Sequence, residues 1–199
     1  MGATETPGTR GRPRSFDTER AVETAMKLFH ARGYDGVGVA ELSRELGIKP
    51  PSFYAAFGSK AGLFGRALER YAAGEANVFA QAQAGGGSVG EVLERTLLRA
   101  AHVYPQHQGA AGCLVLDGTR NSADPDASAL TAAARRASRA AIRDLVAAHV
   151  PARAEEVADF VMVALLGMSA AARDGADEAM LQAFAGNACR ALRREFGLE

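Results

Sequence analysis

The stretch VGVAELSRELGIKPPSFYAAFGSK, residues 37–60, predicts two short helices joined by a tight turn. Apolar residues recur at three- and four-residue steps from Val39 to Leu46, which gives the first helix one apolar face. Gly47 follows directly, and glycine there permits the positive φ with which a chain leaves a helix. Pro50 and the proline after it suit the first turn of a helix, so we expect the second helix to begin there.

The second helix of this pair is predicted to present an exposed face. Phe53 and Phe57 are spaced to point inward, which leaves Ser52 and Tyr54 on the outside. Two helices joined by so short a turn cross steeply, and the second can enter a DNA major groove. Ser43 lies four residues before the turn glycine, where the helices approach most closely and a small side chain is needed. The alternative is an ordinary helical hairpin without a DNA role.

A set of residues at fixed spacing resembles the TetR family of transcriptional regulators over residues 15–70: Arg32-Gly33-Tyr34, Leu42-Ser43, Gly47-Ile48, Phe53-Tyr54, Phe57 and Lys60. The resemblance implies a DNA-binding regulator, more often a repressor than an activator. Two positions depart from the family pattern, because most members carry Ala at Ser43 and a capping Ser or Thr at Lys49. Loss of that helix cap costs about 1 kcal/mol, which the preset φ of the following prolines offsets in part.

The expected architecture is all-α, with about nine helices. An N-terminal three-helix helix-turn-helix DNA-binding domain precedes a C-terminal helical domain for ligand binding and dimerisation, as the resemblance implies. We place a flexible basic arm at 1–14, the helix-turn-helix domain at 15–62, and the effector-binding and dimerisation domain at 63–199.

We call the two helices within residues 37–60 the reading pair. Apolar periodicity and helix-breaking residues predict further helices at 17–32, 60–82, 88–104, 125–149, 153–173 and 177–196. Residues 112–118 fit a buried strand by periodicity. They also resemble a TetR subgroup in which Gly-Cys-Leu begins a short helix, and we therefore expect a helix there.

Composition narrows the class of protein. The chain has 199 residues, of which 48% are hydrophobic, so it can form a sizeable core. It contains no apolar run long enough to span a membrane and no secretory leader, and its two cysteines make no disulfide framework, so we expect a cytoplasmic protein. Net charge is zero, but residues 1–70 hold 11 Lys or Arg against 8 Asp or Glu, and residues 71–199 hold 12 against 15. A basic front and an acidic back fit a DNA reader with a separate second domain.

The predicted DNA contacts come from the basic arm, the turn and the second helix of the pair: Arg12, Arg14, Val39, Lys49, Pro50, Pro51, Ser52, Tyr54 and Lys60. An arm with closely spaced cations can follow phosphates or enter a minor groove, although such runs are also common in solvated tails. Lys60 starts a helix, where the dipole favours anions, so a lysine there suits a phosphate ligand.

The resemblance also implies a small-molecule effector in the second domain and a homodimer formed by the last two helices, about 153–196. The expected effector lining comprises His102, Tyr104, Cys113, Leu116, Phe160 and Met168, each of which can equally be core. Because this lining is mostly apolar, it favours a neutral or aromatic effector.

Cys113 is open to three other interpretations. A thiol at a helix start has its thiolate favoured and can sense oxidants or electrophiles, which is the alternative function. His102, His107 and Cys113 match no closed tetrahedral metal set, so no metal or other cofactor is predicted. A cysteine with a histidine is the minimum for nucleophilic catalysis. The chain has no Gly-rich phosphate loop, paired-carboxylate motif or HExxH sequence, so we do not expect an enzyme.

Overall fold

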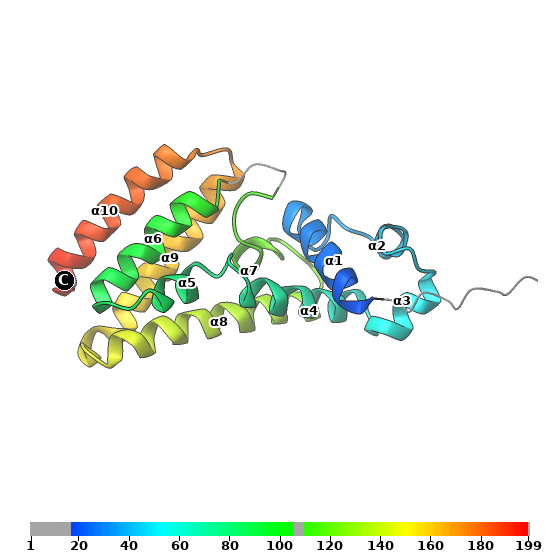
Figure 1. Ribbon diagram of the computed structural model, residues 1–199, viewed down its shortest axis with the longest axis horizontal. Helices are drawn as coiled ribbons and strands as arrows, with labels where there is room; N and C mark the ends of the chain where they lie inside the picture. Colours follow the sequence, from blue (N-terminus) through cyan, green and yellow to red (C-terminus); the bar gives the residue numbers. More distant parts are fainter. Residues whose placement is uncertain (1–16, 106–109, 199) are drawn as a thin grey trace, which may run out of the picture.

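The computed structural model describes residues 17–105 and 110–198, and within these ranges it contains helices and no strands (Figure 1). The helices are α1 (Thr18–Arg32), α2 (Val39–Glu45), α3 (Pro50–Phe57), α4 (Lys60–Ala73), α5 (Val78–Ala84), α6 (Val89–Val103), α7 (Leu114–Asp117), α8 (Pro125–Ala147), the 3₁₀ turn η1 (Pro151–Arg153), α9 (Ala154–Arg173) and α10 (Glu178–Phe196). The all-α prediction is confirmed, and most bounds differ from the expected ones by a residue or two.

The first three helices form a head at one end of the molecule, and α5, α6, α9 and α10 form a body at the other (Figure 1). The helices α4 and α8 run between them. Asp17 caps α1 by accepting a hydrogen bond from the Arg20 N–H at 3.1 Å. The inward face of α1 packs against α4 and ends with the fully buried Phe29.

The turn between α2 and α3 follows the sequence prediction. Gly47 has φ of +66°, and the Ile48 N–H closes the turn by donating to the Ser43 carbonyl at 3.0 Å. Pro50 opens α3, and the residue before it, Lys49, occupies the N-cap without a side-chain hydrogen bond. The helix therefore begins without the usual cap and relies on proline's fixed φ.

Ser43 is buried at this crossing, and its hydroxyl has no hydrogen-bond partner among the described residues. We expect Ser43→Ala to raise the free energy of unfolding by about 1 kcal/mol, because it removes a desolvated polar group without leaving a large cavity. Urea unfolding followed by circular dichroism measures the change, with Ser52→Ala as a control for an exposed hydroxyl. A loss of stability in Ser43→Ala would show that the hydroxyl is satisfied.

The predicted continuous helix over 60–82 was wrong, because the chain breaks it into α4 and α5. Gly74 leaves the helix with an extended backbone. The Asn77 side chain then donates to the Ala72 carbonyl at 2.9 Å and accepts from the Ala80 N–H at 3.1 Å, so it caps α5. Glycine and asparagine both favour helix ends, and this break gives ten α-helices in the described residues rather than about nine.

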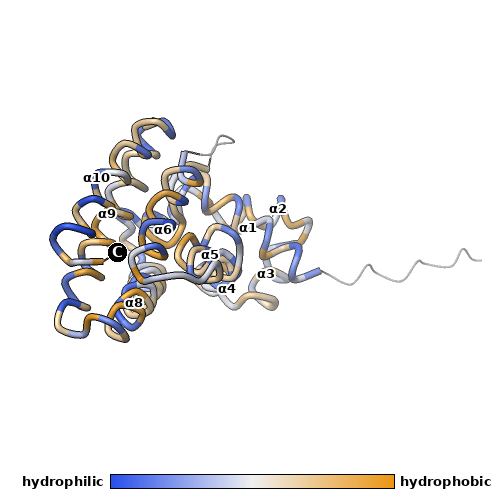
Figure 2. Tube along the Cα trace, turned by 60° about the vertical axis from the view of Figure 1, so that its left-hand side comes forward, coloured by the Kyte–Doolittle hydropathy of each residue, from blue (hydrophilic) through white to orange (hydrophobic). Residues whose placement is uncertain are grey.

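The remaining body helices pack their apolar faces together, with α6 against α10 and α5, and α8 against α9. Along the helices in Figure 2, apolar residues alternate with hydrophilic ones, as expected where one face of a helix is buried. Residues 114–117 form a short helix, so the strand alternative was wrong. No helix in the described part of the chain is long and apolar enough to cross a membrane.

Candidate DNA-reading surface and effector cavities

The helix α3 presents most of the predicted DNA contacts on one open surface. Phe53 and Phe57 are buried and fix the helix against the head. The predicted contact residues at the turn and on α3 are all exposed: Lys49, Pro50, Pro51, Ser52 and Tyr54. The Tyr54 ring is 51% exposed although it is large and aromatic, so it is available to a partner surface.

The other predicted DNA contacts lie in different surroundings. Val39 is partly buried against the core at the first residue of α2, so only part of its side chain is accessible. Arg12 and Arg14 lie outside the described residues.

Lys60 lies at the junction of the head and α8. Its Nζ lies 3.9 Å from the centroid of the Tyr34 ring, a cation–π contact. The Tyr34 hydroxyl donates to Asp124 Oδ2 at 2.7 Å, and Asp124 caps α8. Desolvation lowers the pKa of Lys60, while the charges of Asp35 and Asp124 raise it. The ammonium is therefore held beside α8, and its contact with a DNA phosphate stays a prediction.

Three of the six predicted effector-lining residues share one buried cavity: Tyr104, Cys113 and Leu116. Tyr71 lines the same cavity from α4. The cavity volume is about 60 Å³, which is far below the few hundred Å³ that a drug-sized ligand occupies.

The other three predicted lining residues do not face this cavity. His102 is exposed and lies 3.0 Å from the Glu178 carboxylate, beside a separate surface cleft of about 760 Å³. The Phe160 ring packs on Phe196, with ring centroids 5.8 Å apart. Met168 is 1% exposed within the core. Apolar periodicity put Phe160 and Met168 on an inward helix face, but it does not distinguish the wall of a cavity from packed core.

Burial controls the chemistry of Cys113. The thiol precedes the short helix α7, and sequence reasoning expected the helix start to favour its thiolate. Desolvation instead raises its pKa, with smaller opposing effects from backbone hydrogen bonds and Tyr71. A helix of one turn supplies too weak a dipole to offset this burial, so the cysteine is a protonated thiol at neutral pH.

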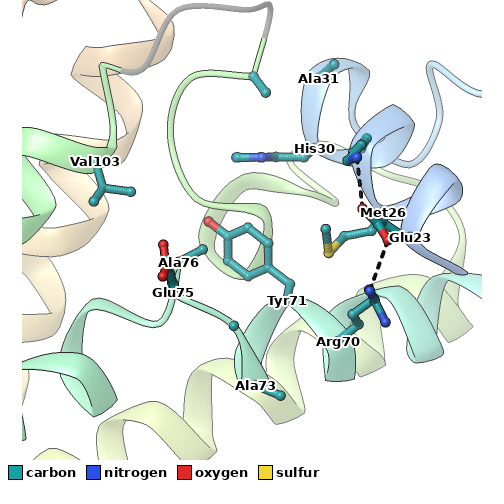
Figure 3. A pocket seen from close by; sticks show the side chains of 13 residues that line it. Glu23, Met26, His30, Ala31, Arg70, Tyr71, Ala73, Glu75, Ala76 and Val103 are labelled. Atoms are coloured by element: carbon teal, nitrogen blue, oxygen red, sulfur yellow. Dashed lines mark hydrogen bonds and ion pairs between the residues drawn. The ribbon is translucent and has the colours of Figure 1, made fainter. Parts of the chain in front are cut away.

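A much larger cleft of about 750 Å³ separates α1 from the end of α6, with α4 as its floor (Figure 3). From α1 it is lined by Glu23, Met26, Lys27, His30 and Ala31, and from α4 by Arg70, Tyr71 and Ala73. Sequence reasoning missed this cleft, because its walls come from two predicted domains whose docking no local pattern encodes. Tyr71 lines both this cleft and the inner cavity.

The segment Gly112–Gly118 joins the cavity wall to the head. The His30 ring donates from Nε2 to the Gly112 carbonyl at 2.9 Å, and Arg173 Nη2 donates to the His30 carbonyl at 3.3 Å. The Tyr34 N–H donates to the Gly118 carbonyl at 2.7 Å. At Gly112 (φ +80°) a Cβ would lie 2.9 Å from atoms of Ser169 and Arg173, so this approach needs glycine.

Asp117 lies at the centre of this segment, with its side chain 1% exposed. Arg120 donates to Oδ1 from Nη2 at 2.5 Å and from Nε at 3.1 Å. Ser169 Oγ donates to Oδ2 and accepts from the Cys113 N–H at 2.8 Å, and Arg173 Nε lies 3.4 Å from the same carboxylate oxygen. The carboxylate thus ties the cavity wall to α9.

Comparisons with known proteins agree with this geometry. The family model described as "Bacterial regulatory proteins, tetR family" matches residues 21–67, which span α2, α3 and most of α1 and α4. The HTH-type transcriptional repressor BdcR of Escherichia coli (strain K12) is 44% identical over 183 residues, covering 92% of both chains. The HTH-type transcriptional repressor ComR of the same organism is 32% identical, covering 92% of this chain and 91% of its own.

A solved structure is also similar over nearly the whole chain. A cysteine mutant of the TetR family transcriptional regulator CifR, complexed with 26-bp double-strand operator DNA, superposes with a TM-score of 0.80 at 32% identity. The superposition covers 90% of this chain and 99% of that one. With full-length relatives at this identity and the α2–α3 reading pair in place, the chain belongs to the TetR family of bacterial regulatory proteins.

Proposed function

We propose that this protein is a homodimeric transcriptional repressor that binds operator DNA through α3 and leaves it when a small molecule binds. The observation that carries the proposal is the exposed surface of α3. The buried rings of Phe53 and Phe57 hold the helix so that its other side chains face outward: Lys49, Pro50, Pro51, Ser52 and Tyr54. The repressor relatives and the operator complex of a similar regulator support this reading. Acting on operator DNA, it would work in the cytoplasm.

The proposed dimer interface is the outer face of α9 and α10. Val163 is 69% exposed, Met180 62% and Phe184 45%, so these large apolar side chains are open to a partner surface. Of the small residues on these two helices, Ala164, Ala185 and Ala188 are buried in the monomer's own core, whereas Gly167 is exposed. Two-fold symmetry would then present two α3 helices to half-sites about one helical turn, or a multiple, apart.

The alternatives have less support. A redox or electrophile sensor at Cys113 needs a reactive thiolate, whereas burial raises the pKa of this thiol. A cysteine-dependent enzyme would need the same thiolate at Cys113. His107 lies outside the described residues.

Binding of the purified protein to its own upstream intergenic DNA tests the proposed function. Fluorescence anisotropy with excess competitor DNA is expected to show specific binding, and pretreatment with a thiol oxidant is expected to leave it unchanged. Specific binding that oxidant abolishes in the wild type but not in Cys113→Ser would favour the redox alternative. If this DNA is not bound, selection of bound fragments from the whole genome locates the operator, and failure of that selection would contradict the proposal.

Lys60→Ala is expected to weaken binding to all DNA sequences about equally and to lower the salt slope of log K by about one. The reason is that a phosphate contact releases counterions but reads no base. Operator and random duplexes are titrated over a series of salt concentrations, with Lys60→Arg as the charge-retaining control. A loss confined to the operator would contradict the phosphate role, and so would an unchanged slope.

A further inference from the structure

The cleft between α1, α4 and the end of α6 has the size of a ligand site, and the inner cavity does not. Its volume of about 750 Å³ lies within the range that small-molecule sites occupy, about 300–1,000 Å³. We propose that the effector of this regulator binds in this interdomain cleft, and that it is an uncharged molecule with an aromatic or apolar body and a hydroxyl group. The proposal rests on the proposed function and names the ligand and site that regulate it.

Tyr71 supplies an aromatic surface for a ligand. It is 4% exposed, and its ring forms a wall of the cleft. Among the described residues no partner makes a hydrogen bond of normal geometry with its hydroxyl, although the Cys113 thiol and the Leu114 backbone lie close enough to affect its pKa. The hydroxyl oxygen is inaccessible to solvent and lies on the side of Cys113 and Leu114, so Tyr71 offers the cleft its ring and not its hydroxyl (Figure 3). An aromatic or apolar body can pack against this ring.

His30, on α1, supplies a polar group beside this ring. Its ring lies across the cleft above Tyr71, with centroids 5.2 Å apart and planes at 72° (Figure 3). A carbonyl oxygen only accepts, so Nε2 carries the proton that binds Gly112. Burial lowers the pKa of His30, so the ring is neutral at pH 7 and its Nδ1 is a hydrogen-bond acceptor. A ligand hydroxyl can therefore donate to His30 Nδ1, and an aromatic body can lie against both rings.

The charges around the cleft favour an uncharged occupant. The Glu23 carboxylate lies 2.9 Å from Lys27 Nζ and 3.0 Å from Arg70 Nη2, so these three charged groups largely satisfy one another. Glu75 brings the lining to two acidic and two basic side chains, with no net charge. An ionised ligand would have to displace these pairs or stay uncompensated, and either costs free energy. The surface cleft beside His102 has similar volume but no tyrosine in its wall.

The position of the cleft explains how an occupant would act on DNA binding. One wall is α1, which belongs to the head and packs against α4, and the other is the end of α6 in the body. His30 connects the head to the body, because its ring donates to the Gly112 carbonyl and its own carbonyl accepts from Arg173. A molecule seated against the His30 and Tyr71 rings would favour a wider separation between α1 and the end of α6. It would release DNA only to the extent that it binds this arrangement more tightly than the DNA-bound one.

Three matched naphthalene probes test the site and the ligand class: naphthylmethanol, which is neutral, naphthylmethylamine, which is a cation, and naphthoate, which is an anion. The chain has four tyrosines and no tryptophan. Binding of a probe beside Tyr71 is therefore measured by fluorescence energy transfer from tyrosine to naphthalene. Naphthylmethanol is expected to bind at least about tenfold more tightly than either ion. The cleft-filling Ala73→Phe should weaken it by at least about tenfold, and the matched Ala80→Phe, on the exposed face of α5, should leave it unchanged.

Equal binding of all three probes would overturn the proposed ligand class, and absence of binding by naphthylmethanol would overturn the proposal as a whole. Equal weakening by both phenylalanine variants, or by neither, would overturn the assigned site. Operator binding of the same three proteins is measured without probe as a separate arm. If the wild type binds no specific DNA while the probe results hold, the repressor function has failed and the cleft stands as a ligand site. If DNA binding is intact and the probe results fail, the cleft proposal alone is wrong.

Discussion

Asp117→Ala is expected to lower the free energy of unfolding by about 3 kcal/mol, the lower end of the range for breaking a buried charge pair. The carboxylate is almost fully buried and accepts from Ser169 and Arg120, with Arg173 beside it. Its removal leaves the Ser169 hydroxyl without its acceptor and the Arg173 guanidinium without its counter-charge. Arg120 is half exposed and can return to water, which keeps the cost below the upper end of the range.

Urea unfolding of Asp117→Ala, Ser169→Ala and the double variant measures this cost and the coupling between the two side chains. Because they are in direct contact, the double variant should cost less than the two single variants together. Asp126→Ala, which removes an exposed carboxylate nearby on α8, is the control. If Asp117→Ala costs no more than this control, or if the two single effects add, the carboxylate does not hold the segment. Operator affinity of Asp117→Ala should fall as well, because the neighbouring Gly118 carbonyl accepts the hydrogen bond from the Tyr34 N–H of the head.

The reading pair could be predicted from the sequence because its determinants are local. Gly47 has the positive φ that its position required, and Pro50 begins the second helix as proline's geometry demands. The buried side of α3 followed from the spacing of Phe53 and Phe57 in the same way. Each of these inferences needs only residues within one or two helical turns of each other.

The functional cavities could not be predicted in this way, because they depend on contacts between distant segments. The cleft exists because α1 docks at an angle to α4, and the His30–Gly112 bond spans 82 positions. The buried carboxylate of Asp117 resembled any polar residue at the end of an apolar run, since its partner Ser169 lies 52 positions away. The break before α5 had a local signal in Gly74 and Asn77, and apolar periodicity across it outweighed that signal.

Val163→Asp is expected to convert the proposed homodimer to a monomer and to weaken operator binding by at least about a hundredfold. Val163 is 69% exposed on α9, next to the open Gly167, so the monomer itself tolerates a polar side chain there. In a two-fold interface each substitution occurs twice, and two like charges facing each other within an apolar patch cost several kcal/mol. Each monomer then binds a single half-site, and the gain from linking two heads is lost.

Sedimentation velocity over a range of concentrations measures the association, and anisotropy with operator DNA measures the affinity. Ala133→Asp, an exposed position on α8 outside the proposed interface, controls for the added charge. Far-UV circular dichroism should show unchanged helix content in both variants, so that loss of association can be told from loss of folding. Because partner binding stabilises the folded chain, the Tm of the wild type should rise with protein concentration and that of Val163→Asp should not. A Val163→Asp protein that still sediments as a dimer would place the interface elsewhere, on a surface that excludes the middle of α9.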